Sequence, residues 1–173
     1  LSMSDTIVVM DSGVIQQIGT PTDIYNEPKN AFVADFIGES NIIEGVMRAD
    51  FWVEMAGHKF KCLDKGFGID EQVDVVVRPE DVDVVPVEKS MLTGIVDSVT
   101  FKGVHYEIIV TINKFKWMIQ STDYVAPQQK IGIYVEPDAI HIMKKSEFSG
   151  MFGDYSSFSD ELEHLSDVTE EEE

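Results

Sequence analysis

The first forty residues alternate between short apolar runs and turn residues. Residues 6–10 and 14–19 are two apolar runs, and Asp11-Ser12-Gly13 between them is turn chemistry, which together predict a two-stranded hairpin. A hairpin alone is only marginally stable in water. We therefore expect this one to pack against another body.

Two short amphipathic helices are expected after the hairpin. The first starts at Pro21 with Thr20 as its cap, since a proline suits the first helical position. The second covers residues 31–37 with Asn30 as its cap. Its apolar pairs at i,i+4 spacing are Phe32/Phe36 and Val33/Ile37.

From residue 41 onward the pattern changes to short strands at close spacing, separated by Gly and Asn turn residues. The expected strands are residues 42–48, 51–55, 59–63, 73–78, 82–85, 92–101, 104–112, 115–120, 131–135 and 140–143. About ten short strands without a long helix predict an all-β barrel or sandwich.

Charge divides the chain into a body and a tail. The sequence has 13 Lys and Arg against 32 Asp and Glu, a formal net charge of −19. Residues 146–173 contain ten acids and no Lys or Arg, which leaves −9 for residues 1–145. This excess of acids argues against nucleic acid and anionic lipid as partners. We expect residues 146–173 to be a solvated tail, with a short helix at 159–165 as the alternative.

The cysteine content and the apolar runs indicate a cellular setting. Cys62 is the single cysteine and cannot form an intrachain disulfide, and no apolar leader precedes the body, so we expect a reducing cytoplasmic location. No apolar run approaches the roughly 18 residues that cross a bilayer. Any membrane association is expected to run through a protein partner.

No arrangement of residues along the chain predicts catalysis. The histidines (His58, His105, His141 and His164) are far apart, and no Cys or His pair has zinc-ligand spacing. A Gly-x-Ser-x-Gly nucleophile turn and a Gly-rich phosphate loop ending in Lys-Ser/Thr are both missing from the sequence. We predict no catalytic, cofactor-binding or metal-binding residue in this chain.

Lysines and aromatic residues interleave at 59–61 and 114–117, as they do on surfaces that stack nucleic-acid bases. Strand periodicity, however, places Lys114 and Lys116 on one face and Phe115 and Trp117 on the other. We therefore expect the aromatic rings in the core and the lysines in water. Single-stranded nucleic-acid binding is the disfavoured alternative.

Two groups of segments resemble a known family. Residues 5–21, 23–28, 32–38 and 41–43 resemble the end of the nucleotide-binding domain of ABC importer ATPases, in the subgroup for polyamine, sugar and oxyanion uptake. The sequences Val-Arg-Pro-Glu-Asp-Val at 77–82, Gly-Ile-Val at 94–96, and Gly-Ile-Tyr-Val-Glu-Pro at 132–137 resemble that subgroup's regulatory TOBE domain, an OB-like β-barrel. Polyamine importers are the most similar members.

The resemblance implies three parts and a mainly β fold. Residues 1–40 would be the C-terminal remnant of a nucleotide-binding domain (the hairpin and two helices), residues 41–145 a TOBE-like regulatory barrel, and residues 146–173 an acidic tail that the resemblance does not cover. The family's phosphate loop, Walker-B pair, signature motif and switch histidine lie upstream of the matched segment. The chain is therefore expected to be a piece of a longer subunit and to be inactive alone.

The implied function belongs to that longer subunit, a transport ATPase that uses ATP and Mg²⁺ to import spermidine or putrescine. Its implied partners are a second copy of itself, transmembrane permease subunits and an external solute-binding protein, at the cytoplasmic face of the cell membrane. Two alternatives stay open. One is an importer subunit for a sugar or another solute, and the other is a β-barrel that binds a small ligand, either an oxyanion or a polyamine.

Overall fold

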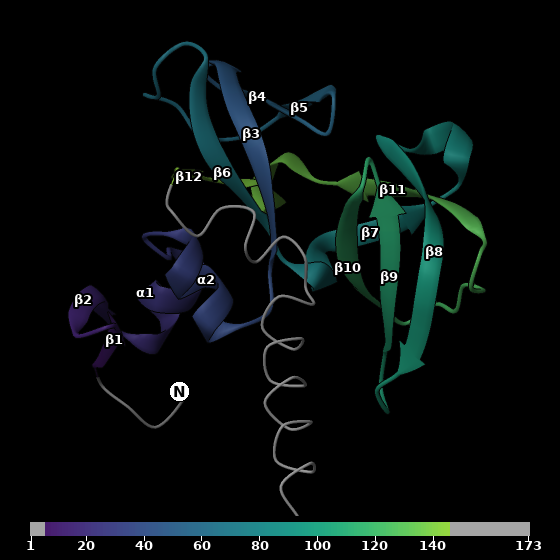
Figure 1. The fold of residues 1–173 in the computed structure, drawn as a ribbon, viewed down its shortest axis with the longest axis horizontal. Coiled ribbons are helices and arrows are strands. Elements are labelled where there is room, and N and C mark those ends of the chain that lie inside the picture. Colours follow the sequence, from purple (N-terminus) through teal and green to yellow (C-terminus); the bar gives the residue numbers. More distant parts are fainter. Residues whose placement is uncertain (1–5, 146–173) are drawn as a thin grey trace, which may run out of the picture.

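The computed structural model describes residues 6–145, which form a small N-terminal lobe beside two β-sheets (Figure 1). The lobe contains β1 (Ile7–Asp11), β2 (Val14–Gly19), α1 (Pro21–Asn26) and α2 (Ala31–Ile37). The first sheet contains β3 (Asn41–Ala49), β4 (Trp52–Met55), β5 (His58–Lys61), β6 (Glu71–Val77) and β12 (His141–Lys144). The second contains β7 (Val82–Val85), β8 (Leu92–Phe101), β9 (Tyr106–Ile112), β10 (Phe115–Ser121) and β11 (Lys130–Val135). Three 3-10 turns are η1 (Pro79–Asp81), η2 (Val87–Lys89) and η3 (Pro137–Ala139).

The lobe forms as its sequence predicts. Thr20 closes a capping box with Asp23: its hydroxyl accepts from the Asp23 amide at 3.2 Å, and its own amide donates to the Asp23 carboxylate at 3.3 Å. The Asn30 side chain accepts from the Val33 amide at 2.9 Å and caps α2. Val9, Ile24 and Val33 bury the inner face of the hairpin against both helices.

All ten strands predicted after residue 41 are present, and their ends differ from the predictions by at most two residues. The differences have local causes. β9 begins at Tyr106 because the Lys102 amide donates to the His105 carbonyl at 2.8 Å and closes the β8–β9 turn. β5 ends at Lys61 because its partner β4 starts at Trp52, after Phe51, whose φ of 69° is left-handed rather than extended.

The strands divide between two antiparallel sheets, which the strand pattern did not predict. Within residues 6–145 the orders are β12-β6-β3-β4-β5 and β10-β9-β8-β11-β7. In the second sheet the edge strands β7 and β10 lie against each other, and η1 packs on β10, so the sheet curls into a barrel-like shape. The fold is mainly β with an OB-like, barrel-like body, as expected.

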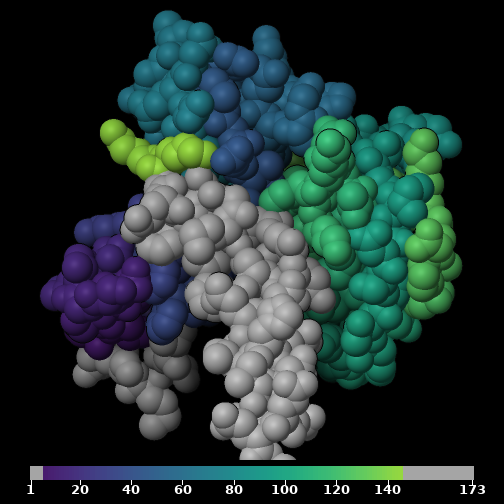
Figure 2. Space-filling view, viewed as in Figure 1, coloured from purple at the N-terminus to yellow at the C-terminus, as the bar shows by residue number. Residues whose placement is uncertain are grey.

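One apolar cluster fills the space between the two sheets. It includes Val75 and Phe60 from the first sheet and Trp117, Ile108 and Ile133 from the second. On the opposite face of the first sheet, α2 packs Ala31 and Ala34 against Ile42, Val76 and Met143. In the space-filling view the purple start of the lobe lies at the left, below the first sheet (Figure 2).

Three further expectations concern the cysteine, a membrane-spanning helix and the acidic tail. Cys62 is buried and is not part of a disulfide. Among the described helices, none is long and apolar enough to cross a bilayer. The predicted acidic tail and its alternative helix at 159–165 lie outside the described residues.

Candidate functional site

The side chain of Arg78 lies where the lobe meets the two sheets, and only 6% of it is exposed. Arg78 follows β6 directly and precedes η1, so the backbone of the sheets holds it in place. Its Nη1 donates to the Ala34 and Gly38 carbonyls, both at 3.0 Å, and to the Ser40 hydroxyl at 2.8 Å. Its Nη2 donates to the Tyr25 carbonyl at 3.1 Å.

These acceptors belong to the C-terminal ends of both helices in the lobe. Tyr25 lies in the last turn of α1, Ala34 in the last turn of α2, and Gly38 is the residue after α2. The final carbonyls of a helix have no partner within the helix, and together they carry a partial negative charge. The buried guanidinium therefore caps two helices at once.

Tyr25 makes two further contacts at this point. The guanidinium carbon of Arg78 lies 4.7 Å from the centroid of the Tyr25 ring, which is a cation–π arrangement. The Tyr25 hydroxyl donates to Glu80 Oε1 at 2.9 Å, and this hydrogen bond, with burial, raises the pKa of Tyr25. Tyr25 is thus held as a neutral donor to the carboxylate that follows Arg78 by two residues.

Asn41 connects the two sheets on the same side of the molecule, and it is 2% exposed. Its Nδ2 donates to the Met118 carbonyl at 2.8 Å and to the Val77 carbonyl at 3.3 Å. Its Oδ1 accepts from the Met118 amide at 2.7 Å. Since Met118 lies on the edge strand β10, the Asn41 side chain takes the place of a neighbouring strand there.

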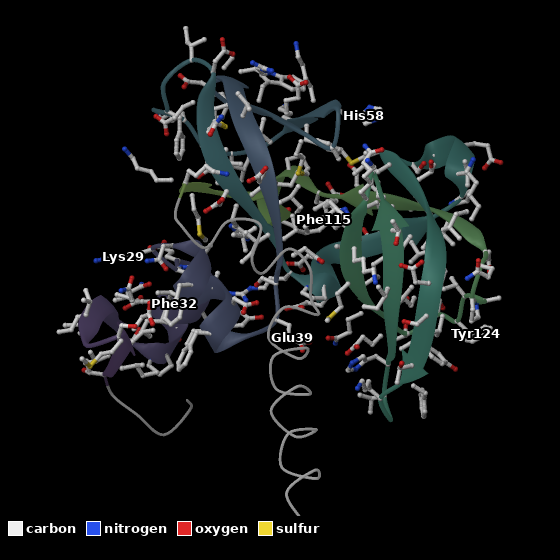
Figure 3. The ribbon with its side chains drawn as sticks, in the orientation of Figure 1. Lys29, Phe32, Glu39, His58, Phe115 and Tyr124 are labelled. Carbon is white, nitrogen blue, oxygen red and sulfur yellow. The ribbon has the colours of Figure 1, made fainter. Side chains whose placement is uncertain are left out.

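An acidic hollow, which we call the junction groove, lies beside Arg78 and extends over the second sheet. One part, of about 220 Å³, is lined by Glu39, Glu80 and Glu107 together with Arg78. A second part, of about 390 Å³, shares Glu80 with the first and adds Asp83 and Asp123. Glu39 is labelled between the end of α2 and the second sheet in Figure 3.

Burial and the crowding of acids change the protonation of carboxylates beside the junction groove. Burial raises the pKa of Glu39, Glu107 raises it further, and Lys102 opposes the change. Burial also raises the pKa of Asp35, near the end of α2, from 3.8 to about 6. The acids that line the junction groove give it a negative charge, while Arg78 beside them already donates to backbone carbonyls.

The lysines and the aromatic residues at 114–117 lie on opposite faces of β10. Lys114 and Lys116 are exposed, while Trp117 is buried and Phe115 packs against it at 6.0 Å between ring centroids, which confirms the predicted separation of faces. Within the part of the chain that the structure describes, no group of three or more His, Cys, Asp or Glu side chains could hold a metal ion. The absence of catalytic residues stays a prediction, and His164 lies outside the described residues.

Sequence reasoning missed Arg78 and Asn41 as junction residues. Both residues lie in segments that resemble the family, at 77–82 and 41–43, and this resemblance is the one sequence feature that could have pointed to them. Glu80 lies in the turn η1 and accepts from the Tyr25 hydroxyl, 55 positions earlier in the chain. The partners of Arg78 are 38 to 53 positions away along the chain, and residue spacing says nothing at that range.

The outer face of the hairpin is the other notable surface, because it is apolar and exposed. Val8 pairs across the strands with Ile18, and Met10 pairs with Ile15. Their exposed fractions are 49%, 54%, 52% and 54% in that order. Four aligned apolar side chains on one side of a two-stranded sheet indicate a surface that is built to be covered.

This chain is similar to one known domain family and to a group of known proteins. Residues 75–143 match the TOBE domain family. The spermidine/putrescine import ATP-binding protein PotA of Desulfitobacterium hafniense (strain Y51) is 59% identical over 145 residues, which are 84% of this chain and 42% of that protein. The protein of the same name from Bacteroides fragilis (strain YCH46) is 53% identical over 153 residues, 88% of this chain and 33% of that protein. The chain thus spans less than half the length of these relatives.

A solved structure is similar in fold alone. It is the cytoplasmic molybdate-binding protein ModG, in a form with molybdate bound, with a TM-score of 0.53 and 14% sequence identity. The match covers 61% of this chain and 96% of that one. At this identity the likeness supports the OB-like architecture and carries no argument about a ligand.

Proposed function

Since this chain contains a TOBE domain and is 52–59% identical over most of its length to the C-terminal part of spermidine/putrescine import ATP-binding proteins, we propose that it is the regulatory and dimerisation part of a polyamine importer's ATP-hydrolysing subunit. The observation that carries this proposal is the continuous identity across both the lobe and the sheets. Similarity confined to the barrel would not connect the lobe with an ATP-binding subunit.

The hairpin supports the proposal from the structural side. Its inner face is buried by α1 and α2, while Val8, Met10, Ile15 and Ile18 point outward. Burying an aliphatic side chain of this size contributes roughly 1.5–3 kcal/mol. We propose that the remainder of an ATP-binding domain covers this face in the longer subunit.

The proposed division of labour follows the three predicted parts. Residues 1–40 belong to the end of the ATP-binding domain, residues 41–145 form the regulatory barrel, and residues 146–173 are an acidic appendage. The longer subunit would bind ATP and Mg²⁺, pair with a second copy, and act with permease subunits and an external solute-binding protein at the cytoplasmic face of the membrane. This chain by itself would be inactive.

A second candidate function is small-ligand binding in the junction groove. Glu39, Glu80 and Glu107 line one part of it, and Asp83 and Asp123 line the other. Such a surface suits an extended cation such as a polyamine and repels an oxyanion such as molybdate. Under this reading the barrel would sense the transported solute.

Calorimetric titration with Mg²⁺-ATP tests the first proposal, with the Desulfitobacterium hafniense relative as the positive control. We expect this chain to show no binding at millimolar ATP. A micromolar dissociation constant would contradict the assignment of ATP binding to residues outside this chain.

Thermal unfolding with spermidine, and separately with molybdate, tests the second candidate. A rise in Tm with spermidine that the Glu80→Gln and Glu107→Gln variants lose would support a cation site in the junction groove. A rise with molybdate alone, or with neither compound, would rule that site out and leave the first proposal standing.

A further inference from the structure

We propose that Arg78 is a coupling residue: its guanidinium fastens the N-terminal lobe to the two sheets so that they move as one body. The inference concerns this chain by itself. Its bearing on an ATP-driven cycle rests on the proposed function.

The proposal rests on where the donor and its acceptors lie. Arg78 is anchored at the end of β6, yet the carbonyls it donates to belong to Tyr25, Ala34 and Gly38, all in or directly after the helices of the lobe. The Ser40 hydroxyl, in the short connection from α2 to β3, is its fourth acceptor and itself donates to the Gly38 carbonyl at 3.2 Å. One side chain from the sheets thus holds both helices and the connection between the two bodies.

Other contacts also cross the boundary. Ala31, Ala34 and Phe32 of α2 pack with Ile42, Val76 and Met143, and the Tyr25 hydroxyl donates to Glu80. Apolar packing of this kind is non-directional, whereas a hydrogen bond depends on the angle between donor and acceptor. Orientation is therefore fixed mainly by the directional hydrogen bonds of Arg78.

The chemistry of the guanidinium suits this task. It is planar and always charged, and it presents several N–H donors in fixed directions, so it can serve acceptors from two helices at the same time. A lysine ammonium is a compact point charge and cannot reach acceptors spread around a planar fork. Loss of Arg78 would remove a donor from four acceptors, of which only the Gly38 carbonyl keeps another described side-chain donor, the Ser40 hydroxyl.

Spin-label distances measure the coupling directly. Lys29 in the lobe and Lys116 on β10 are both exposed and can be changed to cysteine for labelling, while the native Cys62 is 1% exposed and does not compete. Figure 3 labels Lys29 on the lobe. In the otherwise unchanged chain we expect one narrow distance distribution between the two labels.

In Arg78→Gln we expect the width of that distribution to at least double, with an intermediate change in Arg78→Lys. Amide hydrogen exchange should show faster exchange in α1 and α2 and unchanged protection in β8–β11. Arg48→Gln is the control, since Arg48 belongs to the same sheet and its two ion pairs, to Glu54 and Asp70, involve no residue of the lobe. It should leave the distribution unchanged.

Two outcomes would overturn the proposal. One is a folded Arg78→Gln chain whose distance distribution is as narrow as that of the parent. The other is a uniform loss of protection across lobe and both sheets in Arg78→Gln and Arg78→Lys alike, which would make Arg78 a residue of general stability. Neither outcome bears on whether the longer subunit hydrolyses ATP.

Discussion

Asn41 shows how one buried amide can complete a sheet edge. Its side chain exchanges two hydrogen bonds with the backbone of Met118, at 2.8 Å and 2.7 Å, in place of a strand beside β10. Buried backbone groups that lose such partners carry the full cost of desolvation. Asn41 thus links the two sheets by hydrogen bonds, as Arg78 links the lobe to the sheets.

Asn41→Ala is expected to lower the free energy of unfolding by about 2–3 kcal/mol, because the Met118 amide and carbonyl would remain buried and unpaired. Urea unfolding measures the change. Asn26→Ala at the exposed end of α1 is the control and should stay within about 0.5 kcal/mol of the parent. An equally small effect at Asn41 would show that water replaces its amide at no cost.

Asp35 gives the protein a pH dependence with a definite sign. Burial raises its pKa from 3.8 to about 6, Glu39 adds to the rise, and Arg78 and the Ser40 amide oppose it. The folded state therefore binds a proton more tightly than the unfolded state does. The carboxylate destabilises the fold above about pH 6, and this cost is relieved as the pH falls from about 6 to about 4.

Asp35→Asn is expected to raise the free energy of unfolding at pH 7 by about 1–2 kcal/mol, after a discount for partial exposure, and to converge with the parent as the pH falls to about 4. Urea unfolding at both pH values tests this, with the exposed Asp123→Asn as the control. A variant that is less stable than the parent at pH 7 would contradict the assignment of the cost to burial.

At the scale of elements, β8 and β9 approach so closely at Gly94 that no side chain fits. An added Cβ would lie 2.6 Å from Ile112 Cγ1 and closer still to the Thr111 carbonyl. Gly94→Ala is expected to cost about 1–3 kcal/mol through strand displacement. Thermal unfolding measures it, with Gly68→Ala, whose Cβ would meet nothing nearer than 3.5 Å, as a control that should be close to neutral.

The hairpin offers a matched pair of substitutions on its two faces. Ile18 is 54% exposed on the outer face and Val9 is 1% exposed on the inner face. Ile18→Thr should change the stability of this chain by less than about 0.5 kcal/mol, whereas Val9→Thr should cost about 1–3 kcal/mol. Equal losses in urea unfolding would mean that the outer face is already covered.

Local patterns predicted the elements well, because caps and apolar periodicity act over a few residues. Thr20 and Asn30 cap the helices as expected, and every expected strand formed. Pairing between strands could not be predicted in the same way: β3 pairs with β6 and β6 with β12, and alternation along a strand does not name its neighbour. The junction escaped prediction for the same reason, since Arg78 and its partners meet only in the folded chain.

At the scale of the molecule, three features point to one account. The lobe presents an uncovered apolar face, Arg78 holds the lobe to the sheets, and acids line the groove between them. The formal charge of −9 on residues 1–145 fits a body that meets cations and other proteins rather than nucleic acid. These features fit the proposal that this chain is the regulatory end of a transport ATPase, joined to the part that binds ATP.

The most direct test uses a hybrid in which residues 1–145 of this chain replace the matched part of the Desulfitobacterium hafniense relative. ATP-dependent spermidine uptake is measured in cells that lack their own importer. We expect uptake within several-fold of that with the unaltered relative, together with ATP hydrolysis by the hybrid subunit. A hybrid that folds and hydrolyses ATP but imports no spermidine would contradict the proposed function.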